Sequence, residues 1–473
     1  MSISSRLVFF GLLIFGGLSI LFFANANPGY FSNMTYLGAI LLAEILVAST
    51  WQYERTFFLL LMLSFLMAGT NTPLLTAGMS ARWFVLAVGG SAGYVKWIKG
   101  PRQHFGAFHL AALFCVLAAL VSAMVSAIPQ MALLKVLSLF LLFLYGSSGA
   151  RLGVLGREVQ FINGLVLGCE LIVYISFACY FILHEPIFGN PNSLGVVMGV
   201  VAAPVLLWAA VVAQTRSQRH RRAVALFVCW LLLYFSLSRA GMAAAAVSTI
   251  ILCFSLKRQK LLLQAAFTLL FFVAVAGVVA PAHFDDFTGT VTSAVMYKGQ
   301  RQQGVLGSRR TPWQQTVDVI QEHPWFGSGF GTSELAPGAP KVNLSSVYTK
   351  EETGREHGSS YLAITEWVGL FGILPFIFLL FLVLQAITRV CRWMRQTATP
   401  NHFSIPLAMI LSAGLVHAIF EDWLFAAGYY LTVFFWSLAF VLMDLAPSPQ
   451  PKIANSAWHP AVLAASGITT VLR

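Results

Sequence analysis

Three arginines stand in segments where a ligand could meet them. Arg239 lies in FSLSRAG between two apolar runs, and Arg309 and Arg310 lie side by side in LGSRRTPW. A guanidinium binds phosphate oxygens through two parallel hydrogen bonds, and backbone amides at the start of a helix also bind anions. These residues indicate a phosphate-containing ligand. The alternatives are that Arg239 reaches to the membrane surface and that the two loop arginines are only solvated.

A histidine and four acidic residues could move or hold protons. His357 follows Glu356 in REHGSSYL, directly before an apolar run. Imidazole titrates near neutral pH and is the usual general base for a hydroxyl, although a structural histidine at a membrane interface is the alternative. Glu44, Glu170 and Glu366 fall within apolar runs, where each is expected to face the bundle interior and to have a partner. Such scattered acids do not form a proton relay.

The composition excludes a soluble globular protein. Of 473 residues, 58% are hydrophobic and only 10% are charged, and the mean hydropathy is +0.78. A soluble chain carries roughly a quarter of its residues as charged side chains. The six cysteines fall within apolar segments or at their ends and match no CxxC or Cys/His zinc pattern, so neither an external disulfide nor a cysteine-based metal site is expected.

Long apolar runs must position these residues. A membrane-spanning helix needs about 20 mostly apolar residues. The sequence predicts an all-α, polytopic membrane protein with about fourteen transmembrane helices and one long, partly helical external loop between late helices. The first run follows Arg6 like a signal peptide, but we interpret it as a retained span. The runs lie near 7–26, 35–50, 56–72, 83–98, 107–127, 131–149, 160–183, 193–213, 222–238, 240–256, 260–281, 360–388, 403–420 and 424–444.

The distribution of basic residues predicts the orientation. With the N-terminus in the cytoplasm, most of the 29 Lys and Arg residues fall on the cytoplasmic side. Outside the long loop, the opposite side holds only Arg82, Lys135 and Arg239. This asymmetry follows the positive-inside rule, so both termini are expected in the cytoplasm. The formal net charge of +12 is then explained by topology, and no nucleic-acid partner is expected.

The long loop divides the chain. Within it, Pro312 and the segment TPWQQTVDVIQEHPW predict a short amphipathic helix that ends at Pro324 and the glycines after it. In IFGNPNSLG, Asn190 and Asn192 indicate a turn. We expect five parts: helices 1–7 at 1–189, helices 8–11 of the catalytic half at 190–281, the large loop at 282–358, helices 12–14 at 359–444, and a cytoplasmic tail at 445–473.

Five motifs in order carry a resemblance to a known family. They are FGNPNSLG, YFSLSRAG, GSRRTPWQQTVDVIQEHPWFGSGFG, EHGSSYLAITEWVGLFG and FEDWLFAAG. Together they resemble the O-antigen ligase and O-antigen polymerase superfamily of bacterial envelope polysaccharide enzymes. The resemblance covers roughly residues 190–428, whereas the first seven spans resemble the family only in hydropathy.

The resemblance implies a reaction and a location. Members of this family transfer a glycan from an undecaprenyl diphosphate carrier to an acceptor hydroxyl, with no metal, cofactor or nucleotide sugar. It implies that the protein lies in the bacterial inner membrane with a periplasmic active face. Arg239 and Arg309 would hold the diphosphate, and His357 would be the base or the orienting group for the acceptor. Further expected site residues are Glu356 for catalysis and Arg310, Tyr361 and Asn192 for substrate binding.

The resemblance leaves alternatives open. The spacing from His357 to Gly369 is one residue longer than the family's, so either HGSS contains a bulge or this branch uses Glu356 or Ser359 differently. This departure and the span count favour a polymerase of O-antigen, capsule or exopolysaccharide over a ligase that loads glycan onto lipid A core. A lipid-linked oligosaccharide transporter is the rival class, but the sequence shows no repeated halves with interrupted helices in matching positions and ionisable groups near mid-membrane. Expected partners are the lipid-linked donor, a glycan or lipid A core acceptor, membrane lipid and other polysaccharide assembly proteins.

Overall fold

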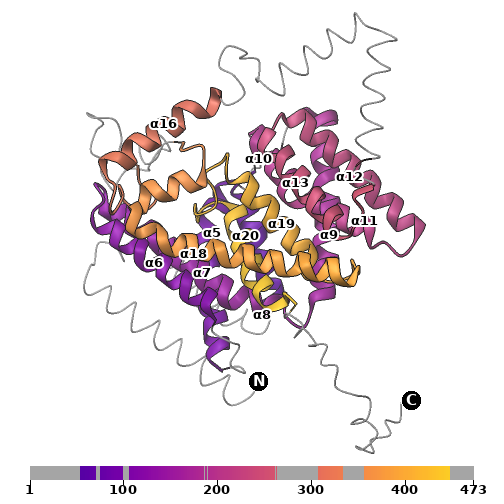
Figure 1. Ribbon diagram of the computed structural model, residues 1–473, viewed down its shortest axis with the longest axis horizontal. Helices are drawn as coiled ribbons and strands as arrows, with labels where there is room; N and C mark the ends of the chain where they lie inside the picture. Colours follow the sequence, from indigo (N-terminus) through magenta and orange to yellow (C-terminus); the bar gives the residue numbers. More distant parts are fainter. Residues whose placement is uncertain are drawn as a thin grey trace, which may run out of the picture.

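The computed structural model describes residues 54–70, 75–99, 106–185, 187–188, 190–260, 263, 307–333 and 356–447. All regular structure within these ranges is helical, as the composition predicts (Figure 1). The predicted runs near 7–26 and 35–50, most of the run near 260–281, and Glu44 lie outside the described residues.

Five of the described helical segments are long and apolar enough to cross a membrane, so the chain is a multi-pass membrane protein in its described part. These segments are α6 (Ala107–Met124), Pro129–Val154, Glu158–Leu183, Pro191–Val211 and α18 (Ser360–Thr397). Shorter apolar helices are α13 (Arg239–Ser255), α19 (Ser404–His417) and α20 (Tyr430–Leu445). The remaining helices are α4 (Glu54–Met67), α5 (Leu75–Lys99), α12 (Arg216–Ser236) and α16 (Gly307–Glu322). The total of about fourteen spans stays a prediction.

Three of the long segments contain a π-helical stretch. Pro129–Val154 comprises α7 (Pro129–Tyr145), η1 (Gly146–Ala150) and α8 (Arg151–Val154). Glu158–Leu183 comprises α9 (Glu158–Ala178) and η2 (Cys179–Leu183), and Pro191–Val211 comprises α10 (Pro191–Val196), η3 (Val197–Ala202) and α11 (Ala203–Val211). Single π-turns inside helices are rare and often lie near functional sites.

The interior of the bundle is formed around α19 and α20. Nearly every residue of α19 is buried, and on α20 the Trp436 ring contacts Phe143 edge-on at 5.4 Å. Buried charges in this interior are paired: Arg151 binds both oxygens of Asp444, at 2.5 and 2.7 Å. Glu170 was expected to have a partner, and it is paired with Arg221 at 3.2 Å.

The six cysteines are free thiols.

Small residues bring α10, η3 and α13 close together. Gly199 packs directly on the backbone of Gly241, and Gly195 packs on Ser238. Small residues four positions apart let two membrane helices approach to backbone contact. The Ser238 side chain caps α13 by accepting a hydrogen bond from the Gly241 N–H at 3.3 Å. This packing fixes the first residue of α13, which is Arg239.

Helix α18 is broken at Gly369, where φ is 67° and ψ is −176°. The segment after α16 binds the backbone groups that the break frees. The N–H of Ser328 donates to the Glu366 carbonyl at 2.9 Å, and the N–H of Leu370 donates to the Pro324 carbonyl at 2.8 Å. Figure 1 shows α18 running across the view beside α6, with α16 at the margin of the bundle. The apolar sequence of this helix did not predict the break. The backbone groups that the break frees bind the segment after α16 and so hold that segment against the bundle.

Candidate functional site

Helix α16 carries the first part of the site. It is the predicted amphipathic helix, but it begins at Gly307 rather than at Pro312. The Trp313 indole N–H donates to the carbonyl of Gly358 at 3.0 Å. Gly358 has a φ of 68°, and an added Cβ would meet the Trp313 ring at 3.2 Å and the Arg309 side chain at 3.3 Å. A left-handed glycine thus turns the chain between His357 and α18 and seats it against α16.

Arg309 lies between two carboxylates. Its Nη1 is paired with Glu356, and its Nη2 is paired with Glu421 in the turn between α19 and α20. The Arg309 side chain is 11% exposed, whereas that of Glu356 is 61% exposed. One cation is therefore oriented by one accessible and one largely covered carboxylate.

Arg239 is near enough to Arg309 for the two charges to interact. Burial lowers the pKa of the Arg239 guanidinium, and the positive charge of Arg309 lowers it further. Arg239 is the first residue of α13, outside the five candidate spans, and its side chain is half-buried. Two like charges held near each other form a favourable place for a polyvalent anion.

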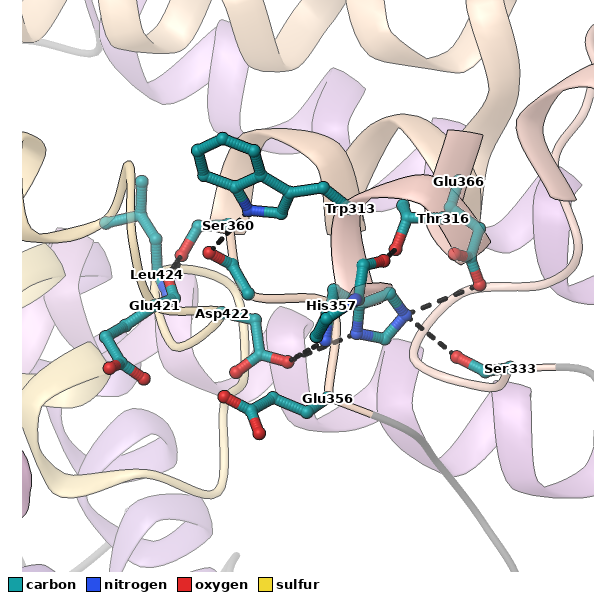
Figure 2. A network of polar contacts seen from close by, with 12 residues as sticks. Trp313, Thr316, Ser333, Glu356, His357, Ser360, Glu366, Glu421, Asp422 and Leu424 are labelled. Carbon is teal, nitrogen blue, oxygen red and sulfur yellow. Dashed lines mark hydrogen bonds and ion pairs between the residues drawn. The ribbon is translucent and has the colours of Figure 1, made fainter. Parts of the chain in front are cut away.

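His357 is bound on both sides of its ring (Figure 2). Nδ1 lies 3.2 Å from Asp422 Oδ2, and the His357 backbone N–H donates to the same oxygen at 3.0 Å. On the other side, Nε2 lies 2.9 Å from the Ser333 hydroxyl and 3.4 Å from Glu366 Oε1. The Trp367 ring packs edge-on at 5.3 Å. The imidazole is thus enclosed.

These carboxylates change the proton affinity of the site. Burial opposes the charged imidazolium, but hydrogen bonds and charge interactions with Asp422 and Glu366 outweigh it and raise the pKa of His357 above its ordinary value. Burial likewise opposes the charged carboxylate of Asp422, but hydrogen bonds from His357 outweigh it and hold the pKa of Asp422 below its ordinary value. The favoured form of the pair is imidazolium with carboxylate.

Ser360, at the start of α18, holds the turn that carries Glu421 and Asp422. Its hydroxyl donates to the carbonyl of Glu421 at 2.6 Å and accepts from the N–H of Leu424 at 3.0 Å. Its backbone N–H also donates to the Glu421 carbonyl, at 3.0 Å. These contacts join the start of α18 to a turn that lies about 61 positions later in the sequence, from Ser360 to Glu421.

The other expected site residues take different places. Arg310 is exposed on α16. The Tyr361 hydroxyl donates to the Leu415 carbonyl at 2.8 Å, so this group already has a structural partner. Asn192 lies in the first turn of α10, where its N–H donates to the Asn190 side chain at 2.9 Å. That interaction is the predicted turn, and α10 packs beside the start of α13.

Sequence reasoning assigned no role to Ser333, Glu421 or Asp422. Glu421 and Asp422 were visible as adjacent acids in FEDWLFAAG, a motif of the resemblance, but nothing in the sequence linked them to His357. Ser333 gave no signal. Glu366, expected to have an interior partner, finds it in His357.

Among the described residues, no three His, Cys, Asp or Glu side chains are arranged to hold a metal ion.

The helices and this site define a class: a multi-pass membrane protein with an arginine, carboxylate and histidine site where loop segments meet helix ends. Residues 224–377 match the family model described as O-antigen ligase. The matched stretch begins in α12, includes Arg239, Arg309 and His357, and ends in α18. It confirms the resemblance to the O-antigen ligase and polymerase superfamily and supports an enzyme of polysaccharide biosynthesis. No curated protein matches the chain.

Proposed function

We propose that this protein transfers a glycan from an undecaprenyl diphosphate carrier to an acceptor hydroxyl at the periplasmic face of the inner membrane. Within this reaction we favour a polymerase that joins repeat units of O-antigen, capsule or exopolysaccharide. The observation that carries the proposal is that the charge of Arg309 acts on Arg239, while Arg309 is paired with Glu356 next to the hydrogen-bonded pair of His357 and Asp422. The match to the O-antigen ligase family supports the reaction class.

The two arginines suit the departing group. When the bond from the sugar to the phosphate breaks, negative charge develops on the carrier diphosphate. Cations fixed in advance near that charge stabilise the transition state more than the ground state. Arg239 and Arg309 are such cations, and the exposed Arg310 on α16 would attract the charged diphosphate of the donor. No metal ion is required for this role in the proposal.

The two carboxylates paired with Arg309 differ in how easily a donor phosphate could replace them. Glu356 is the more exposed partner, so a donor phosphate would displace it and take its hydrogen bonds to the guanidinium. Glu421 is 18% exposed and would stay to orient Arg309. Before the donor binds, the Glu356 carboxylate would therefore occupy the place of the donor phosphate on Arg309.

An apolar groove offers a seat for the carrier tail. It has a volume of about 600 Å³ and lies between α4, α9, η3 and α20, with Tyr430 in its lining. The turn that carries Glu421 leads directly into Tyr430, whose hydroxyl accepts from Tyr429 at 3.0 Å. Gly164 and Gly168 face open space in this groove. A polyprenyl chain would pack along these glycines while its diphosphate lies at the arginines.

A reaction with purified protein tests the proposal. Full-length protein in lipid vesicles is incubated with lipid-linked repeat units and lipid A core in EDTA, and the products are separated by length. Growth of the chain on the carrier supports a polymerase. Transfer only to lipid A core supports a ligase, and movement of intact donor across vesicles without transfer supports a transporter.

A variant expressed in cells provides a second test of the proposed function. For a polymerase, Arg239→Ala should reduce the surface polymer ladder to single repeat units, because the donor diphosphate loses one of its two cations. For a ligase, the ladder should remain on the carrier. A normal surface ladder would contradict a catalytic role for Arg239.

A further inference from the structure

The acceptor hydroxyl must give up a proton, and two groups of the site could receive it. His357 and Asp422 are hydrogen-bonded to each other, so sequence reasoning alone favours the histidine. Their surroundings differ, however. The His357 side chain is 3% exposed, whereas that of Asp422 is 29% exposed. Of the two groups, Asp422 is the one that an incoming acceptor can reach.

Both nitrogens of the His357 ring already have polar partners. Nδ1 lies against Asp422, and Nε2 lies against Ser333 and the fully buried carboxylate of Glu366. An acceptor hydroxyl would have to expel Ser333 to reach Nε2, and it would then stand beside Glu366. Moreover, an imidazolium donates through both nitrogens and has no lone pair that could receive a proton.

We infer that Asp422 is the catalytic base that takes the acceptor proton, and that His357 is a positioning residue that holds Asp422 in place. This assignment rests on the proposed glycan transfer. The two hydrogen bonds from His357 end on the same oxygen, Oδ2. They fix the carboxylate while leaving part of it exposed. Glu366 and Ser333 hold the opposite edge of the imidazole and so prevent it from rotating.

The proton and electron balance of the step is simple. The acceptor oxygen forms a bond to the anomeric carbon of the donor sugar, and its proton passes to the Asp422 carboxylate. The bond between the anomeric carbon and the phosphate oxygen breaks, and the electron pair leaves with the undecaprenyl diphosphate at Arg239 and Arg309. Asp422 then returns the proton to water. His357 keeps the same protonation state throughout.

Kinetics of full-length variants separate the two roles. Asp422→Asn should lower kcat for transfer by about 10²- to 10⁴-fold, the usual loss when a general base is removed, and leave donor affinity unchanged. Asp422→Glu should recover part of that loss. His357→Asn keeps an amide near the position of Nδ1 and should lower kcat by far less. Asp318→Asn, the same substitution on the exposed face of α16, is the matched control and should change neither quantity.

The pH profile gives a readout that a structural defect does not produce. The charged groups facing His357 are Asp422 from the turn before α20 and Glu366 from α18, with Glu356 beside it in sequence. With Asp422 as the base and His357 as a cation, kcat should not fall as the pH drops from 8 to 6, and any fall should occur as the pH rises. His357→Asn should abolish that alkaline fall.

The opposite results overturn the assignment. A wild-type kcat that falls as the pH drops from 8 to 6, with His357→Asn as inactive as Asp422→Asn, would make the histidine the base. Normal kcat in Asp422→Asn would remove Asp422 from the chemistry. If the wild-type protein binds no lipid-linked donor and transfers nothing, the proposed function itself fails, and this result is separate from both others.

Discussion

The backbone N–H and the ring Nδ1 of His357 both contact one oxygen of Asp422, at 3.0 and 3.2 Å. A residue directly before α18 and a residue in the turn before α20 are thereby held as one unit. Ser360 reinforces the arrangement by binding the Glu421 carbonyl at 2.6 Å. The position of the acidic turn thus depends on where α18 begins.

The ion pairs of Arg309 predict opposite effects for its two carboxylates. Glu356→Gln removes the exposed competitor for a donor phosphate and should lower the donor KM by roughly 2- to 5-fold, the size of a partly exposed ion pair. Glu421→Gln removes the covered partner that orients Arg309 and should raise the donor KM. Steady-state transfer at varied donor concentration measures both. Equal effects of the two substitutions would contradict the proposal that the donor phosphate displaces Glu356 while Glu421 stays on Arg309.

The contact between the loop and the broken helix predicts a stability effect. Gly327 has a φ of 76°, and an added Cβ would strike the carbonyl oxygens of Glu366 and Trp367. Gly327→Ala should lower the melting temperature and reduce transfer, because Glu366 would move away from His357. Gly156 has the same φ but open space around it, so Gly156→Ala should cost only about 1–2 kcal/mol of left-handed strain. Equal destabilisation by the two would mean that the close approach is unimportant.

The groove predicts a way to block the carrier tail without touching the polar site. Gly168→Leu adds a side chain into open space and should fold normally, because leucine is a better helix former than glycine. The donor KM should rise for the full-length polyprenyl carrier and change less for a short-chain analogue. Val159→Leu, on an exposed part of α9, is the control. An unchanged KM for the long carrier would place the tail elsewhere.

The raised pKa of His357 predicts how stability varies with pH. A histidine whose folded pKa lies above its unfolded value near 6.5 adds stability below that value, and the contribution is lost as the pH rises through the folded pKa. The wild-type protein should therefore gain more in melting temperature than His357→Asn when the pH is lowered from 8.5 to 6. The groups responsible are Asp422 and Glu366. Identical pH dependence in both proteins would contradict a charged His357.

The sequence predicted the elements better than their contacts. Amphipathic spacing indicated α16, and hydropathy indicated the long helices, because both patterns repeat locally. The break at Gly369 was hidden inside an apolar run, since the groups that satisfy its backbone come from 324–329. Asp422 was equally hidden, because its role depends on a contact with His357 across 65 positions.

If Arg239 and Arg309 hold the same carrier diphosphate, the two substitutions should be coupled in a double-mutant cycle on kcat/KM for the lipid-linked donor. Arg239→Gln, Arg309→Gln and the double variant are compared with the wild-type protein, and Arg216→Gln on α12 serves as the control. Side chains that share one ligand should show a coupling energy of about 0.5–3 kcal/mol. The loss of kcat/KM in the double variant should therefore differ from the product of the two single losses by that amount. Losses that simply multiply, or a single variant with normal kcat/KM, would contradict it.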